Sequence, residues 1–240
     1  TTPGPARAVV PKPGRTHIGH DVGGPVCRTV QHRKRQTGSV SEPDDPLLRA
    51  RSLRSVEAAR RLYDEWAERY DHDVFEQAGV TGSLQVADLL AEYVRDRSTP
   101  VVDLGCGTGA VGTRLAELGF TTITGLDLSP AMLSVAERTG AYRHLAECDL
   151  TNPIETEDRF GAAVSAGTFT TGHVTAEAVP GVLALLQPEA TIVWAIAPTL
   201  WPSFEQRLDA ARAHISASEA VPIRPGTDDL THLIVAQLPG

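Results

Sequence analysis

Apolar residues return at every third or fourth position between residues 55 and 70. These positions are Val56, Ala59, Tyr63, Trp66 and Tyr70. Charged residues occupy the other face, so the spacing predicts an amphipathic helix, for which Ser55 is a suitable cap. The same spacing predicts a second helix over 83–97, and Pro100 separates that helix from the apolar run that follows.

Short apolar runs alternate with helical patterns along the rest of the chain. The runs that predict strands cover 101–104, 121–126, 142–148, 160–166 and 191–197. The patterns that predict helices cover 109–118, 130–138, about 176–187 and 203–217. This alternation predicts an α/β fold, a mostly parallel sheet with helices on both faces. The segments 219–223 and 232–238 flank a Pro-Gly loop and predict a closing antiparallel hairpin, which brings the sheet to seven strands.

The most informative stretch is 101–109, where an apolar strand ends in an acid and three glycines alternate. Glycine has no side chain, so a ligand can lie against the backbone at this strand-to-helix turn, where the amides of the new helix are free to receive it. Asp127 follows Asp103 by 24 residues and closes the next expected strand, where a carboxylate can bind the two hydroxyls of a ribose. Together these features predict a nucleoside-containing cofactor in a doubly wound sheet.

A dinucleotide is the first alternative, because Gly107, Gly109 and Gly112 fit the pattern G-x-G-x-x-G. Asp103 argues against it, since a carboxylate inside the motif would repel a diphosphate and instead suits a cofactor with an ammonium group and a positive sulfur. Asp149 closes the next expected strand and is placed to reach an adenine amino group. A glycine-rich turn without a ligand would not explain acids at the ends of three successive strands.

The run Asp-Leu-Gly-Cys-Gly-Thr-Gly at 103–109 resembles the signature of class I S-adenosylmethionine (SAM) methyltransferases. The run Gly-Leu-Asp-Leu-Ser-Pro at 125–130 and the pair Met132-Leu133 are similar to the same family. The resemblance implies SAM as the cofactor. It also implies the Rossmann-like class I methyltransferase fold, which closes with an antiparallel hairpin.

Two further segments narrow the resemblance. The helix segment 63–74 and the segment 165–174 resemble the methyltransferase-like proteins named for the Williams–Beuren syndrome region, and this resemblance runs from about residue 60 to the end of the chain. Two positions depart from those relatives. Phe160-Gly161 replaces Phe-Asp at the fourth strand, and 188–190 reads Pro-Glu-Ala where relatives have Pro-Gly-Gly. The chain is thus expected to be a diverged member whose substrate cannot be taken from its relatives.

Position and resemblance together assign expected cofactor contacts. These are Tyr63, Tyr70, Asp103, Gly105, Cys106, Gly107, Asp127, Leu128, Met132, Asp149, Leu150 and Ala166. Asp103 is expected to hold the methionine ammonium, directly or through water, and Asp127 the ribose. Leu128 and Met132 would flank the adenine, with Asp149 and Leu150 at its edge. By resemblance Tyr63 and Tyr70 would close over the methionine end, the alternative being simple core packing of their helix.

Methyl transfer from a sulfonium needs alignment and, for some acceptors, removal of a proton, but no metal. His173 is the expected catalytic base, because it follows the fourth strand at the edge where such sheets bind ligands. The alternative is a helix-capping or structural histidine. Cys106 is expected to contact the cofactor rather than act as a nucleophile. Trp194, Trp201 and Phe204 are candidates for an apolar substrate wall or, alternatively, for the core.

The expected partner is a small-molecule methyl acceptor. The segment after the fourth strand lacks the Asn/Asp-Pro-Pro-Tyr/Phe pattern that is used to methylate amino groups of bases or glutamine. The first alternative is a protein that binds SAM without transferring methyl, as a regulator, cyclase or partner subunit. A nicotinamide oxidoreductase is the second, and it would bind NAD instead.

Charge and composition divide the 240-residue chain into a basic Pro/Gly-rich extension over 1–50 and a methyltransferase domain over 51–240. Residues 1–40 carry a net charge of +6 and the whole chain −8, so the remainder carries −14 and is a poor general binder of nucleic acid. No run is long enough for a membrane span, and no leader pattern begins the sequence. Three cysteines without metal-ligand spacing fit a reducing cytoplasm.

Overall fold

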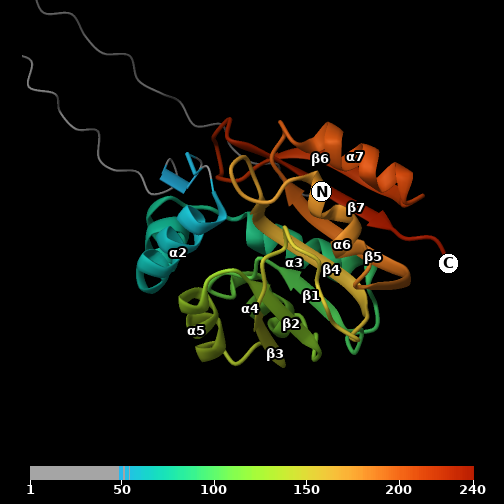
Figure 1. The fold of residues 1–240 in the computed structure, drawn as a ribbon, viewed down its shortest axis with the longest axis horizontal. Helices are drawn as coiled ribbons and strands as arrows, with labels where there is room; N and C mark the ends of the chain where they lie inside the picture. The colour runs from blue at the N-terminus through green and yellow to red at the C-terminus, as the bar shows by residue number, and fades with distance from the viewer. Residues whose placement is uncertain (1–48, 51, 54) are drawn as a thin grey trace, which may run out of the picture. The chain divides into compact units, whose positions relative to one another are not determined.

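The computed structural model describes residues 49–50, 52–53 and 55–240 (Figure 1). The extension expected at 1–50 therefore lies almost wholly outside the described residues. Ala50, at the start of the described residues, is buried and packs in one cluster with Leu62, Trp66 and Val74. Within this described part, no helix combines the length and the apolar character needed to cross a membrane.

The described strands form one seven-stranded sheet in the order β3-β2-β1-β4-β5-β7-β6. They are β1 (Val101–Leu104), β2 (Ile123–Asp127), β3 (His144–Glu147), β4 (Phe160–Phe169), β5 (Leu186–Ile196), β6 (His214–Pro222) and β7 (Leu230–Gln237). Strands β1 to β5 are parallel, and β7 pairs antiparallel with both β5 and β6. The predicted fold, including its antiparallel hairpin, is confirmed. The strand order reverses between β1 and β4, the point at which doubly wound sheets bind ligands.

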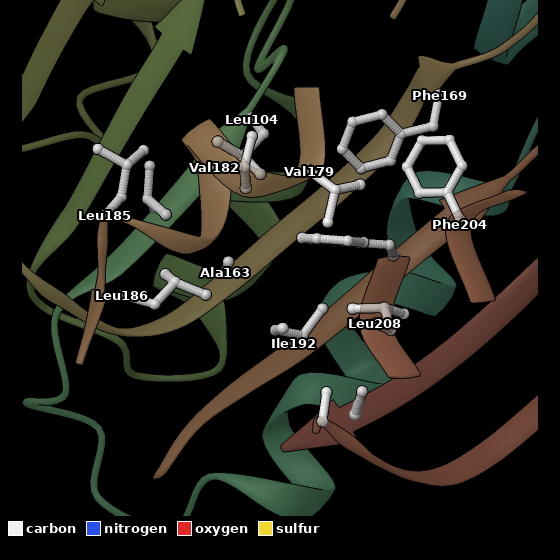
Figure 2. Close-up of a cluster of buried hydrophobic side chains, with 14 of the residues drawn as sticks. Leu104, Ala163, Phe169, Val179, Val182, Leu185, Leu186, Ile192, Phe204 and Leu208 are labelled. Atoms are coloured by element: carbon white, nitrogen blue, oxygen red, sulfur yellow. The ribbon is translucent and has the colours of Figure 1, made fainter. Parts of the chain in front are cut away.

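The two faces of the sheet are covered by different helices. The helical elements are α2 (Val56–Asp71), η1 (His72–Gln77), α3 (Gly82–Tyr93), α4 (Ala110–Glu117), α5 (Pro130–Arg138), η2 (Ala176–Ala178), α6 (Val179–Leu183) and α7 (Trp201–Ala210). Leu90 of α3 and Leu115 of α4 belong to the buried cluster on one face. Val182 of α6 and Phe204 of α7 pack with Leu104 in the cluster on the other face (Figure 2).

Three predicted helices are too long. The predictions 83–97, 176–187 and 203–217 end in the structure at Tyr93, Leu183 and Ala210. The first stops because Val94 adopts an extended backbone conformation. The other two stop because the following residues join the sheet, where Leu186 pairs with Phe160 and His214 pairs with Gln237. Sheet hydrogen bonds at these positions override the local preference for helix.

Helix α2 continues directly into the π-helix η1, which the sequence pattern did not predict. Its wider turn is closed by the Ala78 amide, which donates to the carbonyl oxygen of Asp73 at 3.1 Å. The indole Nε1 of Trp66 donates to Asp73 Oδ2 at 2.8 Å and so ties the turn to α2. Short π-helical turns are frequent at functional sites, and this one carries Val74 and Phe75.

Candidate functional site

Two adjoining cavities lie at the carboxyl-terminal ends of the parallel strands. The first has a volume of about 110 Å³ and the second about 390 Å³. Both are lined by Tyr63, Tyr70, Gly105, Gly107, Ala166, Gly167 and His173. Of the other residues predicted to contact the cofactor, Asp127, Leu128, Met132, Asp149 and Leu150 line the first cavity and Cys106 the second. The structure thus brings nearly all the predicted site residues together.

The glycines after β1 are needed for two different reasons. Gly105 has φ +69°, and a Cβ added there would lie 1.9 Å from the Thr168 hydroxyl, which itself donates to the carbonyl oxygen of Leu104 at 3.0 Å. Gly105 is therefore required for close packing of the loop against β4. Gly107 has φ +55°, and an added Cβ would meet no atom within 4 Å. Its left-handed backbone faces open space, where a ligand can approach the chain.

Asp127 is held rigidly at the end of β2. Its Oδ2 accepts a hydrogen bond from the Gly107 amide at 2.8 Å, and its Oδ1 accepts one from the Ser129 amide at 2.9 Å. Burial raises the pKa of this carboxyl, while the backbone amides of Ser129, Gly107 and Leu128 oppose the rise. The carboxylate is thus oriented toward the first cavity by the glycine loop itself, in a position suited to a pair of hydroxyl groups.

Asp103 lies beneath the loop and lines neither cavity, unlike the other predicted contacts. Its side chain is fully buried, and Oδ2 accepts a hydrogen bond from the Tyr142 hydroxyl at 2.7 Å. Its Oδ1 has no hydrogen-bond partner among the described residues. The pKa of Asp103 is raised to about 7, because burial and the nearby Asp127 raise it more than the hydrogen bonds from Tyr142 and the Gly112 backbone lower it. A buried carboxylate oxygen without a partner is the arrangement that a cationic group would satisfy.

Tyr142 is a supporting residue that sequence reasoning missed. Its hydroxyl accepts a hydrogen bond from the Gly112 amide at 3.1 Å while donating to Asp103. A Cβ at Gly112 would lie 2.2 Å from the Tyr142 ring, so this glycine makes room for the tyrosine rather than for a dinucleotide. The residue stood at the start of a predicted strand, and nothing in its periodicity indicated a polar contact with Asp103.

At the far end of the first cavity, Asp149 organises its own loop. Its Oδ1 accepts hydrogen bonds from the amide and the hydroxyl of Thr151, and its Oδ2 accepts one from the side-chain amide of Asn152. Leu150 beside it is buried. Cys148 also lines this cavity, and the sequence analysis had not assigned it there. The loop after β3 therefore presents one carboxylate on a fixed turn and a mainly apolar surface.

Helix α2 is fastened to the loops of the site by two aspartates. The Ser129 hydroxyl donates to Asp64 Oδ1 at 2.5 Å, and the Thr108 hydroxyl donates to Asp71 Oδ1 at 2.5 Å. Ser129 also caps α5, since its Oγ accepts a hydrogen bond from the Met132 amide. One face of α2 thus joins the loop after β1 to the loop after β2.

Two ion pairs extend this contact along the same helix. Arg60 pairs with Glu147 of β3, and Glu68 pairs with Arg138 of α5. The four polar residues of α2 follow helical spacing and form one stripe, at positions 60, 64, 68 and 71. The neighbouring stripe is aromatic, with Tyr63, Trp66 and Tyr70 in mutual ring contact. The amphipathic pattern of the sequence therefore marks a helix that covers the site, not one that covers the sheet.

His173 lies where the two cavities join. Its Nε2 is 2.9 Å from the Tyr63 hydroxyl, and its Nδ1 is 2.8 Å from the Thr170 hydroxyl. Burial lowers the pKa of His173 below 6.5, while a backbone hydrogen bond at Thr171 opposes that effect. Burial raises the pKa of Tyr63 well above 10. The imidazole is thus neutral at pH 7 and the Tyr63 hydroxyl keeps its proton, so each ring nitrogen has one hydroxyl as its hydrogen-bond partner.

The three aromatic residues proposed for a substrate wall are placed differently. Trp194 and Phe204 are fully buried and contact Phe169, with ring centroids 5.0 and 4.9 Å apart. Phe169 and Phe204 lie side by side in Figure 2. Trp201 stacks on His232, with centroids 4.6 Å apart. None of the three lines either cavity. The structure therefore supports the alternative that these three residues pack in the core, because each belongs to or borders the buried cluster at α7.

The site residues fit a positively charged nucleoside. The first cavity combines a fixed carboxylate, an apolar pair formed by Leu128 and Met132, and a second acid on the loop after β3. The glycine loop leaves open space above Gly107, and the unpartnered oxygen of Asp103 lies below it. A dinucleotide diphosphate would meet this acid without any arginine or lysine in the described walls.

Comparison with known proteins gives a match over the cofactor motifs. Residues 101–189 match a family described as "Methyltransferase domain". Together with the sheet order, this partial match supports SAM as the cofactor of the site.

Individual proteins match this chain over part of its length or at low sequence identity. The chain is 32% identical over 147 residues to human Methyltransferase-like protein 27, an alignment that covers 60% of each protein. The chain thus spans less than two thirds of the length of this relative. Among solved structures, the magnesium protoporphyrin IX methyltransferase from Synechocystis with bound SAM has a TM-score of 0.57 at 15% identity, covering 82% of this chain and 99% of that one. The [4+2]-cyclase SpnF has a TM-score of 0.60 at 17% identity, covering 78% and 97%.

Proposed function

We propose that this protein transfers a methyl group from SAM to a small organic acceptor, with His173 as the catalytic base. The observation that carries the proposal is the position of His173, a neutral imidazole at the junction of the two cavities. The first cavity has the acids expected for an adenosyl group, and the second offers space on the other side of His173. A base at such a junction would face the acceptor and not the adenine.

The residues assigned to the cofactor keep their proposed roles. Asp127 would bind the ribose hydroxyls, Leu128 and Met132 would flank the adenine, and Asp149 with Leu150 would meet its edge. Asp103 would stabilise the methionine ammonium from below the glycine loop, through its unpartnered oxygen. Tyr63 and Tyr70 line both cavities and would cover the methionine end, while Cys106 and Ala166 complete the wall.

When bound, SAM supplies an activated methyl group, so the acceptor lone pair forms the new bond to carbon while the carbon–sulfur bond breaks and leaves S-adenosylhomocysteine. The protein must align the acceptor and remove its proton. In the proposed tautomer Nδ1 carries the proton beside Thr170, and Nε2 accepts from Tyr63 until an acceptor binds. The acceptor O–H or N–H would replace Tyr63 as the donor and pass its proton to Nε2.

The proposed family is the methyltransferase-like group named for the Williams–Beuren syndrome region, and the similarity to human Methyltransferase-like protein 27 supports membership of a methyltransferase-like group. The proposed compartment is the cytoplasm. Cys106 and Cys148 are free thiols in the described part, in keeping with a reducing environment.

The test is product formation. The full chain would be incubated with SAM and a panel of acceptors, and S-adenosylhomocysteine and methylated product would be measured together. Stoichiometric formation of both supports methyl transfer. The likeness to SpnF shows that this fold also serves a cyclase, so the fold alone does not decide between transfer and binding. Retention of SAM without any S-adenosylhomocysteine would favour the SAM-binding alternative, and binding of NAD in place of SAM would contradict both.

A further inference from the structure

The second cavity extends well past the residues proposed to hold the cofactor. One end is formed by the glycine loop and the start of α4, including Cys106 and Val111. A second part of the wall, here called the acceptor lobe, comes from other elements. Its apolar wall consists of Phe75, Val80, Ala197, Pro198, Ile223 and Leu230. The lobe therefore draws on η1, the end of β5 and the β6–β7 hairpin.

The frame of the acceptor lobe is set by backbone contacts. The Thr81 amide donates to the carbonyl oxygen of Ile223 at 2.9 Å and ties the segment after η1 to the hairpin. The Ile223 amide donates to the carbonyl oxygen of Asp229 at 2.9 Å and closes the hairpin loop. Phe75 meets Tyr70 edge-on, with ring centroids 6.0 Å apart. These contacts make the lobe a formed cavity, and the whole of about 390 Å³ falls within the range of small-molecule sites.

The described wall of the second cavity contains no lysine or arginine. Its ionisable residues are Tyr63, Tyr70, Cys106, His173 and Asp229. Burial raises the pKa of Tyr70 to about 12 and lowers that of His173, so these rings are neutral at pH 7. Asp229 forms an ion pair with Arg224 at 3.1 Å. The wall thus offers hydroxyl groups and apolar carbon, and its one formal charge is negative.

An anionic acceptor would be strongly disfavoured in such a cavity. A carboxylate or phosphate that leaves water needs a cation or several hydrogen-bond donors in compensation. Here the described wall offers no lysine or arginine, Asp229 is already paired with Arg224, and Asp127 in the adjoining cavity would repel the anion.

From this wall we infer that the acceptor is an uncharged, largely apolar small molecule, ring-sized, that presents one weakly acidic O–H or N–H to His173. The inference rests on the proposed methyl transfer and adds the chemical class of its substrate. Polar side chains of the lobe, Thr170 and Thr231, supply hydrogen bonds for a neutral polar group. The exposed side chain of Leu230 forms an apolar rim.

Binding of matched ligand pairs tests the class. Suitable probes are 2-naphthol against 6-hydroxy-2-naphthoate and indole against indole-5-carboxylate, measured by calorimetry on the full chain saturated with S-adenosylhomocysteine. We expect each neutral member to bind at least about tenfold more tightly than its carboxylate, since the wall leaves that charge uncompensated. Equal or tighter binding of the carboxylates, preference for a lysine peptide, or no binding by any probe would overturn the inference.

A pair of variants tests the role of charge directly. Leu230→Arg adds a cation at the rim of the lobe, where the leucine is 40% exposed and contributes little to the core. Leu84→Arg is the matched control, because Leu84 is 45% exposed on α3 and lines neither cavity. Leu230→Arg should strengthen binding of the carboxylate probes about tenfold, and Leu84→Arg should leave it unchanged. An equal effect of both variants, or none from Leu230→Arg, would overturn the inference.

The two proposals fail in distinguishable ways. Affinity for S-adenosylhomocysteine is measured first, and neither arginine variant should change it. Loss of cofactor binding in the unmodified chain would overturn the proposed function. A normal cofactor response with carboxylate-selective binding would overturn only the acceptor class. Selective binding of neutral probes without any methylated product would support the inferred ligand class of the lobe and contradict methyl transfer to these acceptors.

Discussion

The hydroxyl of Tyr63 lies 2.9 Å from Nε2 of His173, although the two residues are 110 positions apart. Tyr63 belongs to α2, and His173 lies in the loop after β4. Their contact joins the covering helix to the edge of the sheet at the junction of both cavities. It also holds Nε2 of the imidazole at that junction.

Replacement of His173 by alanine should reduce turnover much more than SAM affinity. Loss of a general base costs about a hundredfold or more in rate, whereas the affinity should stay within about twofold. At saturating SAM, the turnover rate of the unmodified enzyme should hold down to pH values below 6.5, because burial keeps His173 neutral there. Steady-state rates and calorimetry check the two quantities, and His144→Ala in the exposed strand β3 is the control. Equal losses of rate and affinity would mark His173 as a cofactor-binding or structural residue.

Asp127→Asn should weaken SAM binding about ten- to a hundredfold, since charge-assisted hydrogen bonds to the ribose are worth roughly 1.5–3 kcal/mol. Asparagine keeps the shape of the side chain and one acceptor oxygen, so it retains one of the two bonds from the amides of Gly107 and Ser129, and the fold should survive the loss of the other. Calorimetry measures the affinity and circular dichroism the fold. Asp158→Asn, on an exposed loop, is the control. An unchanged dissociation constant in the folded variant would show that the ribose binds elsewhere.

SAM affinity should depend on pH through Asp103. Its pKa is raised from 3.8 to about 7 in the ligand-free site, so below pH 7 the carboxyl is mostly neutral and must lose a proton to pair with an ammonium group. Affinity should therefore fall by about tenfold per unit below pH 7 and level off just above it. Asp103→Asn should flatten this dependence. Calorimetry between pH 5.5 and 7.5 checks it, and a steep slope that persists in the variant would assign the proton to another group.

The raised pKa of Asp103 affects folding in the opposite direction, since it makes the folded chain less stable as the pH rises. The folded chain holds a proton on Asp103 that the unfolded chain releases above pH 3.8. This group therefore contributes stability fully below pH 3.8, and the contribution is lost as the pH rises through 7. In chemical denaturation, the free energy of unfolding of Asp103→Asn should fall less from pH 5 to pH 7 than that of the unmodified chain. An identical pH dependence in the two proteins would contradict the raised pKa.

Removal of residues 1–45 should leave both SAM binding and the fold intact, because the cofactor motifs and the periodic helices of the sequence all lie beyond them, as do the described residues that line the two cavities. Calorimetry and thermal unfolding of the truncated chain check this expectation. The truncation keeps Ala50, which packs with Trp66 of α2. If the shortened chain unfolds or loses SAM, the basic extension is an integral part of the site.

The sequence specified the sheet and the cofactor edge because both depend on local signals. Buried strands such as Val101–Leu104 are short apolar runs, and Gly105 and Gly107 have backbone conformations that other residues rarely adopt. Acids at strand ends, such as Asp127, fall at one edge of any parallel sheet. These features follow from chain order alone.

Other parts of the site depend on contacts that periodicity does not encode. The bond from Tyr142 to Asp103 and that from Ser129 to Asp64 join segments far apart in sequence. The sequence could not decide whether Trp194 packs in the core or lines a cavity, because an aromatic residue at a strand end fits both positions equally well. The overlong helix 203–217 was predicted from local preference, whereas pairing with β7 decides the structure after Ala210.

Helix α2 places Tyr63 and Tyr70 in the walls of both cavities, while its polar stripe joins it to three neighbouring elements. Because this one helix lines both cavities, a displacement of α2 would widen both at once. Raised ionic strength, which weakens the exposed ion pairs Arg60–Glu147 and Glu68–Arg138, should therefore speed ligand exchange in both cavities together.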